Sequence, residues 1–181
     1  AKRYDLEVRA AAEPEPAPLL PGAAETSPEE NLWEPLAADL RRRIRANRST
    51  LVFANSRRTT EKVTRFLNQG QAEELAYSHH GSLSREIRAV VEERLKQGRL
   101  KGIVSTSSLE LGIDIGALDE VVLVQTPPSV AAAVQRIGRA GHQVGETSRG
   151  RLYPVHERAV LDAAVVARGV LEGDIAELAP I

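Results

Sequence analysis

The sequence predicts an α/β domain whose mostly parallel sheet is covered by helices on both faces, a doubly wound arrangement. Short apolar runs alternate with longer amphipathic segments from about residue 50 onward, which is typical of repeated strand–helix units. The run Val121-Val122-Leu123-Val124 is continuously apolar, as expected of a strand that is covered on both faces. A chain of 181 residues suits one such domain, or one domain with an extra arm.

The N-terminal part of the chain contains three different patterns. Residues 4–9 alternate polar and apolar side chains and predict a half-buried strand. Residues 10–30 are rich in Ala, Pro and Glu without a periodic apolar face, so we expect a flexible loop there. A helix is predicted over 33–46, since its apolar residues recur near helical spacing. These residues are Trp33, Leu36, Ala37, Leu40 and Ile44.

The later elements follow in strict alternation. The predicted strands cover residues 50–54, 74–78, 103–104, 121–124 and 152–155. The predicted helices cover residues 57–69, 84–97, 129–139 and 157–169. Ser84 is a suitable N-cap and Gly98 a suitable stop for the helix between them. In sheets of this kind ligands bind outside the carboxyl ends of the strands. We therefore expect the chemistry in the loops at 54–58, 79–84, 105–116, 125–129 and 139–145.

Composition excludes several classes of protein. The chain has no Cys, which excludes disulfides and thiolate metal sites. No apolar run approaches about 18 residues, so no membrane span is expected, and no secretory signal is visible. The formal net charge of −1 gives no support to nucleic-acid binding by the domain as a whole. Any contact with phosphates must come from a local cluster or from main-chain N–H groups. Because the chain lacks Met and starts at Ala1, we expect a piece of a longer protein.

The segment Gln135-Arg136-Ile137-Gly138-Arg139-Ala140-Gly141-His142 combines two arginines with two glycines. Arg136 and Arg139 are three residues apart and would share one face of a helix. The glycines allow a backbone or a polyphosphate to come close. An arginine presented in this way can stabilise charge on a transferred phosphoryl group. The alternative is a solvated helix end with two surface arginines, and the residues alone leave both interpretations open.

Three other loops carry groups that could hold phosphates. In 104–115 a strand ends in hydroxyl residues, and the turn that follows can present N–H groups to an anion, although Ser and Thr also serve as simple caps there. Asn55, Ser56 and Arg57 fall on a strand-to-helix turn, where a capped helix start with exposed arginines is the alternative. His79 and His80 lack a third ligand at zinc spacing and, as neighbours on a strand end, point apart. We expect no metal there, and backbone contacts through Gly81 and Ser82 instead.

Together these segments resemble the motifs of superfamily 2 helicases. Residues 135–142 resemble motif VI and residues 104–115 resemble motif V. Residues 51–58 resemble motif IV, and 79–84 the His-Gly segment that follows it. The resemblance covers about residues 49–145. The residues of 104–115 and 135–142, with the turn Thr126-Pro127-Pro128-Ser129, are similar to the sequences of the large helicase-related (Lhr) family. This resemblance implies a RecA-like domain, the second of two in an ATP-dependent translocase that unwinds DNA or RNA–DNA duplexes.

The resemblance also implies roles for individual residues. Arg139 matches the arginine finger on the ATP γ-phosphate, with Arg136 and Gln135 as supporting catalytic residues. The implied ATP-binding residues are Gly112, Asp114, Arg139 and His142. The last of these departs from the family pattern, since it replaces the usual second finger. The implied nucleic-acid-binding residues are Asn55, Ser56, Arg57, His80, Gly81, Ser82, Ser105, Thr106 and Ser107.

Two motifs of a complete ATPase are missing from the sequence. It contains no Gly-x-x-x-x-Gly-Lys-Ser/Thr loop to cradle phosphates, and no Asp-Glu-x-His/Asp segment to hold Mg²⁺. The resemblance places both on the first RecA-like domain, so ATP and Mg²⁺ are expected to bind mainly there. The expected partners are that domain of the same polypeptide and single-stranded DNA or RNA. The expected location is a bacterial or archaeal cytoplasm, without membrane contact.

Three parts of the chain are predicted: an edge strand and loop over 1–30, the helicase domain over 31–170, and the start of a linker over 171–181. Two other functions remain open at this point. The domain could be a non-catalytic RecA-like scaffold that mediates protein contacts in a repair complex, an idea that only His142 favours. It could also belong to a nuclease or repair subunit that carries a helicase-like domain.

Overall fold

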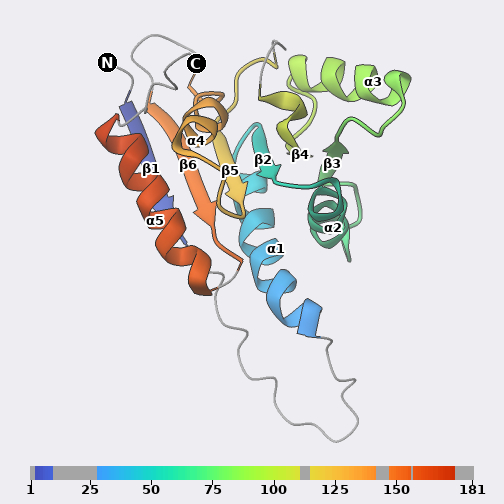
Figure 1. Cartoon of the computed structure of the whole chain (residues 1–181). Coiled ribbons are helices and arrows are strands. Elements are labelled where there is room, and N and C mark those ends of the chain that lie inside the picture. Colours follow the sequence, from blue (N-terminus) through green and yellow to red (C-terminus); the bar gives the residue numbers. More distant parts are fainter. Residues whose placement is uncertain (1–2, 10–27, 111–114, 142–146, 156, 174–181) are drawn as a thin grey trace, which may run out of the picture.

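One six-stranded parallel sheet forms the centre of the molecule (Figure 1). The computed structural model describes residues 3–9, 28–110, 115–141, 147–155 and 157–173. The strands are β1 (Arg3–Val8), β2 (Thr50–Ala54), β3 (Ala76–His79), β4 (Gly102–Ser105), β5 (Glu120–Val124) and β6 (Thr147–Tyr153). They lie in the order β1-β6-β5-β2-β4-β3, and every neighbouring pair is parallel. The predicted parallel sheet is confirmed.

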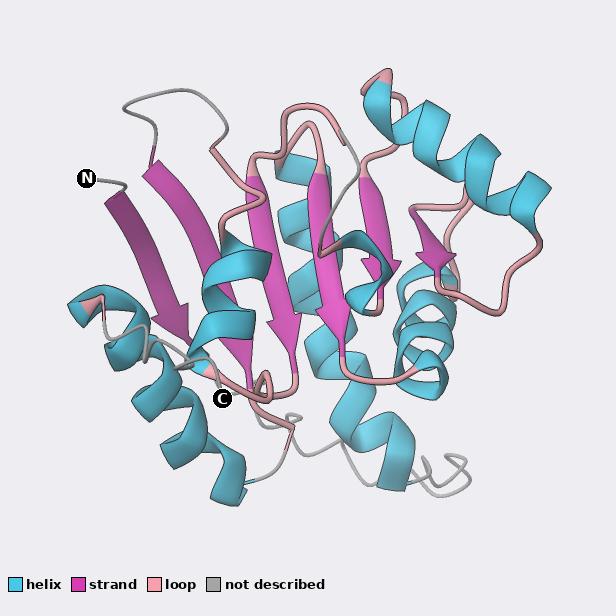
Figure 2. Ribbon diagram, turned by 45° about the horizontal axis from the view of Figure 1, so that its top comes forward, coloured by secondary structure: helices cyan, strands magenta, loops and turns pink. Residues whose placement is uncertain are grey.

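Helices cover both faces of this sheet, which confirms the doubly wound architecture (Figure 2). They are α1 (Pro28–Ala46), α2 (Arg57–Asn68), α3 (Arg85–Lys96), α4 (Val130–Ile137) and α5 (Glu157–Glu172), with a short 3₁₀ turn η1 (Ser107–Leu109). Successive side chains of a strand point to opposite faces. Val52 therefore packs under α1 and α2, whereas its neighbours Leu51 and Phe53 pack under α3, α4 and α5. Two separate apolar cores result.

Several helix ends follow from the residues predicted to form them. Ser84 caps α3, since its hydroxyl accepts a hydrogen bond from the backbone N–H of Ile87 at 3.3 Å. Gly98 follows that helix with a φ of 67°, a conformation that glycine adopts without steric cost. Ser129 caps α4 in the same way as Ser84 caps α3. The predictions for Ser84 and Gly98 are confirmed.

Several element boundaries differ from the prediction. Helix α1 begins at Pro28, five residues before Trp33 and inside the predicted loop; the rest of that loop, residues 10–27, lies outside the described residues. Strand β3 covers 76–79 instead of 74–78, because the side chain of Asn68 captures the backbone N–H groups of Leu75 and Ala76. Strand β6 starts at Thr147, five residues before the predicted strand.

Helix α4 ends at Ile137 instead of residue 139. The next backbone hydrogen bonds, from Arg139 to Arg136 and from Ala140 to Ile137, span only three residues and tighten the chain into a turn. Arg139 therefore lies beyond the helix, and its position relative to Arg136 comes from this turn rather than from one helical face. At the other end of the chain, α5 continues to Glu172, two residues past the predicted domain boundary.

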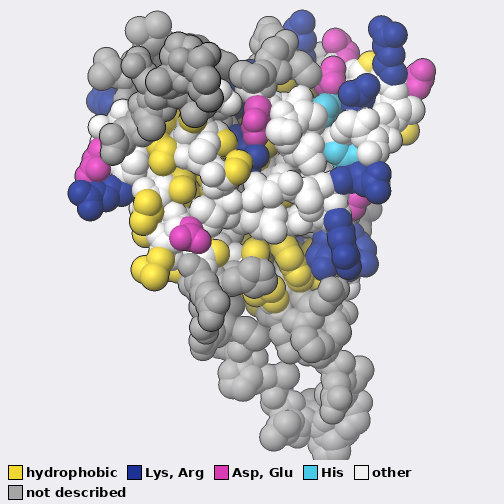
Figure 3. Space-filling model, in the orientation of Figure 1, with side chains coloured by type: hydrophobic (Ala, Val, Ile, Leu, Met, Phe, Trp, Pro, Cys, Tyr) yellow, Lys and Arg dark blue, Asp and Glu magenta, His cyan; other side chains and the backbone are white. Residues whose placement is uncertain are grey.

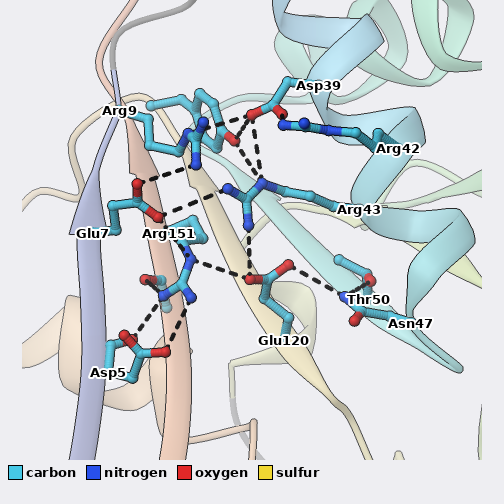
Figure 4. Close-up of polar contacts among 12 residues, drawn as sticks. Asp5, Glu7, Arg9, Asp39, Arg42, Arg43, Asn47, Thr50, Glu120 and Arg151 are labelled. Carbon is cyan, nitrogen blue, oxygen red and sulfur yellow. Dashed lines mark hydrogen bonds and ion pairs between the residues drawn. The ribbon is translucent and has the colours of Figure 1, made fainter.

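A network of ion pairs joins the edge strand β1 to its neighbours and to α1 (Figure 4). Glu120, the buried first residue of β5, lies 3.1 Å from Nη1 of Arg43 and 3.2 Å from Nε of Arg151. Arg151 in β6 also pairs with Asp5 at 3.0 Å and with Glu7 at 3.3 Å. Because these charges come from α1, β1, β5 and β6, the network fixes β1 as part of the domain.

The same network continues to a tyrosine at the end of β6. Arg43 donates a hydrogen bond from Nε to the hydroxyl of Tyr153 at 2.9 Å, and this hydroxyl donates to Asp39. Burial and the bond to Asp39 raise the pKa of Tyr153. Burial opposes ionisation of Asp39, but hydrogen bonds from Tyr153 and Arg42 outweigh it, so the pKa of Asp39 lies below its ordinary value. Among the described residues no helix is long and apolar enough to cross a membrane.

Candidate functional site

The predicted site residues gather at one edge of the sheet. Strands β5, β2, β4 and β3 are consecutive neighbours and run parallel, so their carboxyl ends lie side by side (Figure 2). The loop after β2 carries Asn55, Ser56 and Arg57. The loop after β3 carries His80, Gly81 and Ser82, and the end of β4 carries Ser105, Thr106 and Ser107. The predicted residues therefore lie at the carboxyl ends of the strands, where sheets of this kind bind ligands.

Arg136 is the centre of the contacts between α4 and the strand ends. Its side chain is buried, with 4% of the residue exposed. Its Nε donates to Oε1 of Glu110 at 2.6 Å, and its Nη1 donates to Oδ1 of Asn55 at 2.9 Å. The guanidinium also lies 5.3 Å from the ring centroid of Phe53, within the range of a cation–π contact. Arg136 therefore holds the loops after β2 and β4 against α4, which is a positioning role.

Asn55, which accepts from Arg136, also contacts the loop after β5. Its Nδ2 donates to the backbone oxygen of Thr126 at 2.7 Å, and its backbone N–H donates to Oε1 of Gln125 at 3.3 Å. Gln125 has a φ of 76°, which is uncommon for a residue other than glycine. Such conformations concentrate at functional sites, where the surrounding contacts enforce them. Both ends of the Asn55 amide are thus engaged within the protein.

Arg139 reaches the same residue as Arg136 by a different group. Its Nε donates to the backbone oxygen of Glu110 at 2.9 Å, and its Nη2 donates to that oxygen as well. A carbonyl is a neutral acceptor, so this contact orients the half-buried guanidinium rather than pairing its charge. Gly141, with a φ of 66°, closes the turn; a Cβ there would lie 3.1 Å from the backbone oxygen of Thr147. Gln135 is exposed on α4.

Three predicted ATP-binding residues, Gly112, Asp114 and His142, lie outside the described residues. Their flanking residues Glu110 and Gly141 are described. Glu110 contacts both Arg136 and Arg139, so this described residue of the segment 104–115 lies beside the segment 135–142.

The loops after β2 and β3 are joined by exposed polar side chains. Ser56 caps α2, accepting from the backbone N–H of Thr59 at 3.1 Å, and Arg57 donates from Nη1 to Oγ of Ser82 at 2.9 Å. Gly81 is exposed, and a Cβ there would meet no atom within 4 Å. These groups stand at the surface, where a phosphate backbone could reach them.

The histidines of the predicted His-Gly segment are both buried. His79 bonds to Oγ of Ser108 and to Oε1 of Glu92, each at 2.8 Å. His80 bonds through Nε2 to Glu61, while its buried Nδ1 has no hydrogen-bond partner in the structure. The imidazoles thus support the loop from beneath. Within the described ranges no three His, Asp or Glu side chains gather as metal ligands would.

The hydroxyl groups after β4 divide into supporting and accessible ones. Ser105 is fully buried and bonds to Oγ of Ser108 at 3.1 Å. The backbone N–H of Thr106 donates to the oxygen of His79 at 3.2 Å, which fixes the turn against β3. Thr106 is half-buried and Ser107 is exposed. Only these last two of the three predicted hydroxyls stand where an external phosphate could meet them.

Sequence reasoning missed several residues of this site, namely Glu61, Glu92, Ser108, Glu110 and Gln125. Glu110 and Ser108 lie inside the segment 104–115, but neither has a partner near it in sequence. Glu110 meets Arg136 across 26 residues, and Ser108 meets His79 across 29. The order of the strands in the sheet was needed to see these contacts.

The chain matches a family model and several known proteins. The family is the helicase conserved C-terminal domain, matched over residues 34–143. An Lhr helicase/probable uracil glycosylase of Mycolicibacterium smegmatis is 39% identical, over 98% of this chain and 13% of the relative. An ATP-dependent helicase Lhr-Core of Methanothermobacter thermautotrophicus is 47% identical, over 73% of this chain and 16% of the relative.

Solved structures agree with this likeness. The Mycobacterium smegmatis helicase Lhr bound to single-stranded DNA and AMP-PNP superposes with a TM-score of 0.83 at 44% identity. The superposition covers 96% of this chain and 22% of that chain. The Saccharomyces cerevisiae protein Dbp5 bound to RNA, at 21% identity and a TM-score of 0.70, shares the fold over 96% of this chain and 40% of its own.

Proposed function

Because this chain belongs to the helicase conserved C-terminal domain family and is similar to Lhr helicases, we propose that it is the second motor domain of an ATP-dependent helicase. Its fold is RecA-like. The chain spans only 12 to 18% of the length of the Lhr relatives with which it was compared. The proposed activity therefore belongs to a longer polypeptide, in which this domain and a first RecA-like domain would enclose ATP between them.

The observation that carries this proposal is that Glu110 contacts both arginines of the segment 135–142. Its carboxylate holds Arg136, and its backbone oxygen holds Arg139. Glu110 is the C-cap of the turn η1, which begins at Ser107 and has Thr106 as its N-cap. If Arg139 moved toward a phosphate, its contact with Glu110 would change, and with it the loop after β4 that is proposed to hold the nucleic-acid backbone. Such a mechanical link between two binding functions is what a translocating motor requires.

Arg139 is proposed as the arginine finger. Guanidinium is always charged and forks onto phosphate oxygens, and the glycines beside it leave room for a phosphate to approach. Arg136 would act through position alone, because it is buried and fully engaged with Glu110 and Asn55. Gln135, Gly112, Asp114 and His142 would complete the side of the ATP site that this domain supplies. Mg²⁺ would be held mainly by the first domain, where it would neutralise phosphate charge.

The strand would be gripped by the three loops beside these contacts. These loops present hydroxyl, guanidinium and main-chain groups at one surface. The groups belong to Ser56, Arg57, Gly81, Ser82, Thr106 and Ser107. Contacts of this kind hold phosphates and carry no base specificity. The exposed Asn55 and the buried His80 and Ser105 would hold these loops in shape. The cleft between the two domains would close when ATP binds and reopen after hydrolysis. If the contacts with the strand tighten and loosen in step with this cycle, the strand moves.

A comparison of the isolated chain with the intact protein tests whether this domain supplies only one side of the ATP site. The isolated chain is expected to hydrolyse no ATP above a buffer blank, since it lacks the phosphate loop, whereas the intact protein is expected to hydrolyse ATP faster when single-stranded DNA is added. Turnover by the isolated chain would contradict the division of the site between two domains. An intact protein whose hydrolysis ignores added DNA and RNA would contradict the motor function itself.

A further inference from the structure

Helix α2 carries a row of basic side chains on the face that points away from the core. Arg58, Lys62 and Arg65 are spaced by four and three residues, so they share one face of the helix. The opposite face is buried. With Glu61, the three basic residues line a shallow hollow of about 430 Å³. Figure 3 shows Lys and Arg side chains gathered over the part of the surface where Figure 1 places α2.

This α2 row, defined as Arg58, Lys62 and Arg65, begins where the proposed strand grip ends. The helix starts at Arg57, whose guanidinium already contacts Ser82 of the neighbouring loop. Its first turn contains no acidic residue. From residue 57 to residue 65 the helix axis advances about 12 Å, at roughly 1.5 Å per residue. Positive charge therefore continues outward from the grip along one helix.

The surroundings of the row keep its charge at the surface. Glu61 is the one acidic residue of α2, and its carboxylate is bonded to His80 beneath the loop after β3. The ammonium of Lys62 lies 5.5 Å from the ring centroid of Trp33, a cation–π distance that holds it against the surface. The whole chain has a formal net charge of −1. The row is thus a local concentration of positive charge on a domain that is otherwise near neutral.

We propose that the α2 row is a second binding site for nucleic-acid phosphates, which holds the strand just beyond the loops at the strand ends. This inference rests on the proposed function, because the strand must first be bound at those loops. Arg and Lys on a solvent-facing helix would contact phosphates without reading the bases. An acidic protein segment is the other ligand that such a row could take, but its continuity with Arg57 and Ser82 favours the nucleic-acid strand.

The test compares two variants of the intact protein that lose the same number of charges. The first is Arg58→Gln/Lys62→Gln/Arg65→Gln. The control is Arg45→Gln/Arg94→Gln/Arg99→Gln, which neutralises three exposed residues around a hollow near the amino ends of β3 and β4. Dissociation constants are measured for oligothymidines of about 4 to about 16 nucleotides, lengths that span the single-strand site sizes of individual OB folds, over a series of salt concentrations.

The α2 variant is expected to bind the longest oligonucleotide with a shallower salt dependence. The slope of log K against log [salt] should fall by up to about 2, since each single-strand phosphate contact contributes about 0.7. The shortest oligonucleotide, which fills only the loops, should bind as it does to the unmodified protein. The control should match the unmodified protein throughout. Arg58→Lys/Arg65→Lys, which keeps the charges, should also keep the slope.

Two results would overturn the inference while leaving the proposed function intact. In the first, the unmodified protein binds the long oligonucleotide and the α2 variant binds it with the same slope, which would leave the row for another ligand such as an acidic protein segment. In the second, the control variant loses as much of the slope as the α2 variant, which would reveal an effect of net charge. If the unmodified protein binds no strand of any length, the inference and the proposed function fall together.

Discussion

The Nε atom of Arg136 lies 2.6 Å from Oε1 of Glu110, which is 26 residues away in the sequence. The pair is well shielded from water, with side-chain exposures of 4% and 15%. Glu110 also accepts from Arg139 through its backbone oxygen. One residue therefore positions both arginines of the segment 135–142.

Loss of the Glu110 carboxylate should destabilise the domain strongly. Glu110→Ala leaves the buried guanidinium of Arg136 without its counter-charge, and breaking a buried pair from one side costs about 3–5 kcal/mol. The free energy of unfolding from denaturant titration measures this cost. Glu172→Ala is the matched control, because its pair with Arg168 is exposed on α5 and such pairs contribute about 0–1 kcal/mol. Equal effects of the two substitutions would contradict the positioning role.

The network around Asp39 should make the domain less stable in acid. Because its pKa is lowered in the folded chain, Asp39 stabilises the fold above its unfolded pKa of about 3.9. This contribution is lost as the pH falls through the lower folded value. Asp39→Asn should therefore flatten the decline of unfolding free energy below about pH 4. The exposed Asp162→Asn is the control, and a profile for Asp39→Asn that parallels it would refute the prediction.

Gly150 in β6 should tolerate no side chain. A Cβ at this position would lie 2.7 Å from Cδ2 of Leu6 and 3.0 Å from Cγ2 of Ile137. Gly150→Ala should lower the unfolding free energy by about 1–3 kcal/mol through overpacking, measured by thermal or chemical denaturation. Gly81→Ala, where a Cβ meets no atom within 4 Å, should remain near the stability of the unmodified chain. An unchanged Gly150→Ala variant would show that β1 and α4 can move apart at little cost.

Local sequence patterns were enough to predict the elements whose apolar residues match their burial in the fold. The continuous apolar run at 121–124 belongs to the central strand β5, and the helical spacing from Trp33 to Ile44 marks the buried face of α1. Strand β6 was predicted only in part, because Arg149 and Arg151 are untypical of a buried strand. Arg151 is accommodated there by carboxylates of β1 and β5, and that pairing exists only once the strands have assembled.

For the candidate site, the sequence located the segments but not the contacts among them. The motifs named Arg136, Arg139, Asn55 and Thr106, and the parallel sheet places their loops along one edge. The burial of Arg136, however, depends on Glu110 and Asn55, which lie 26 and 81 residues away. Residue types alone therefore did not separate the positioning arginine from the one that we propose as a finger.

The central claim, that Arg139 acts on ATP across the domain interface, is tested most directly by Arg139→Lys in the intact protein. Strand-stimulated ATP hydrolysis and strand affinity are measured on the same preparation. The rate should fall by orders of magnitude, up to the roughly 10³–10⁵-fold that an arginine finger contributes, while strand affinity stays nearly unchanged. Arg136→Lys should reduce the rate less, and His142→Ala should be mild, because an imidazole lacks the permanent charge and the forked donors of a guanidinium. A near-normal rate for Arg139→Lys, or a loss for His142→Ala as large as that for Arg139→Lys, would contradict the single-finger account.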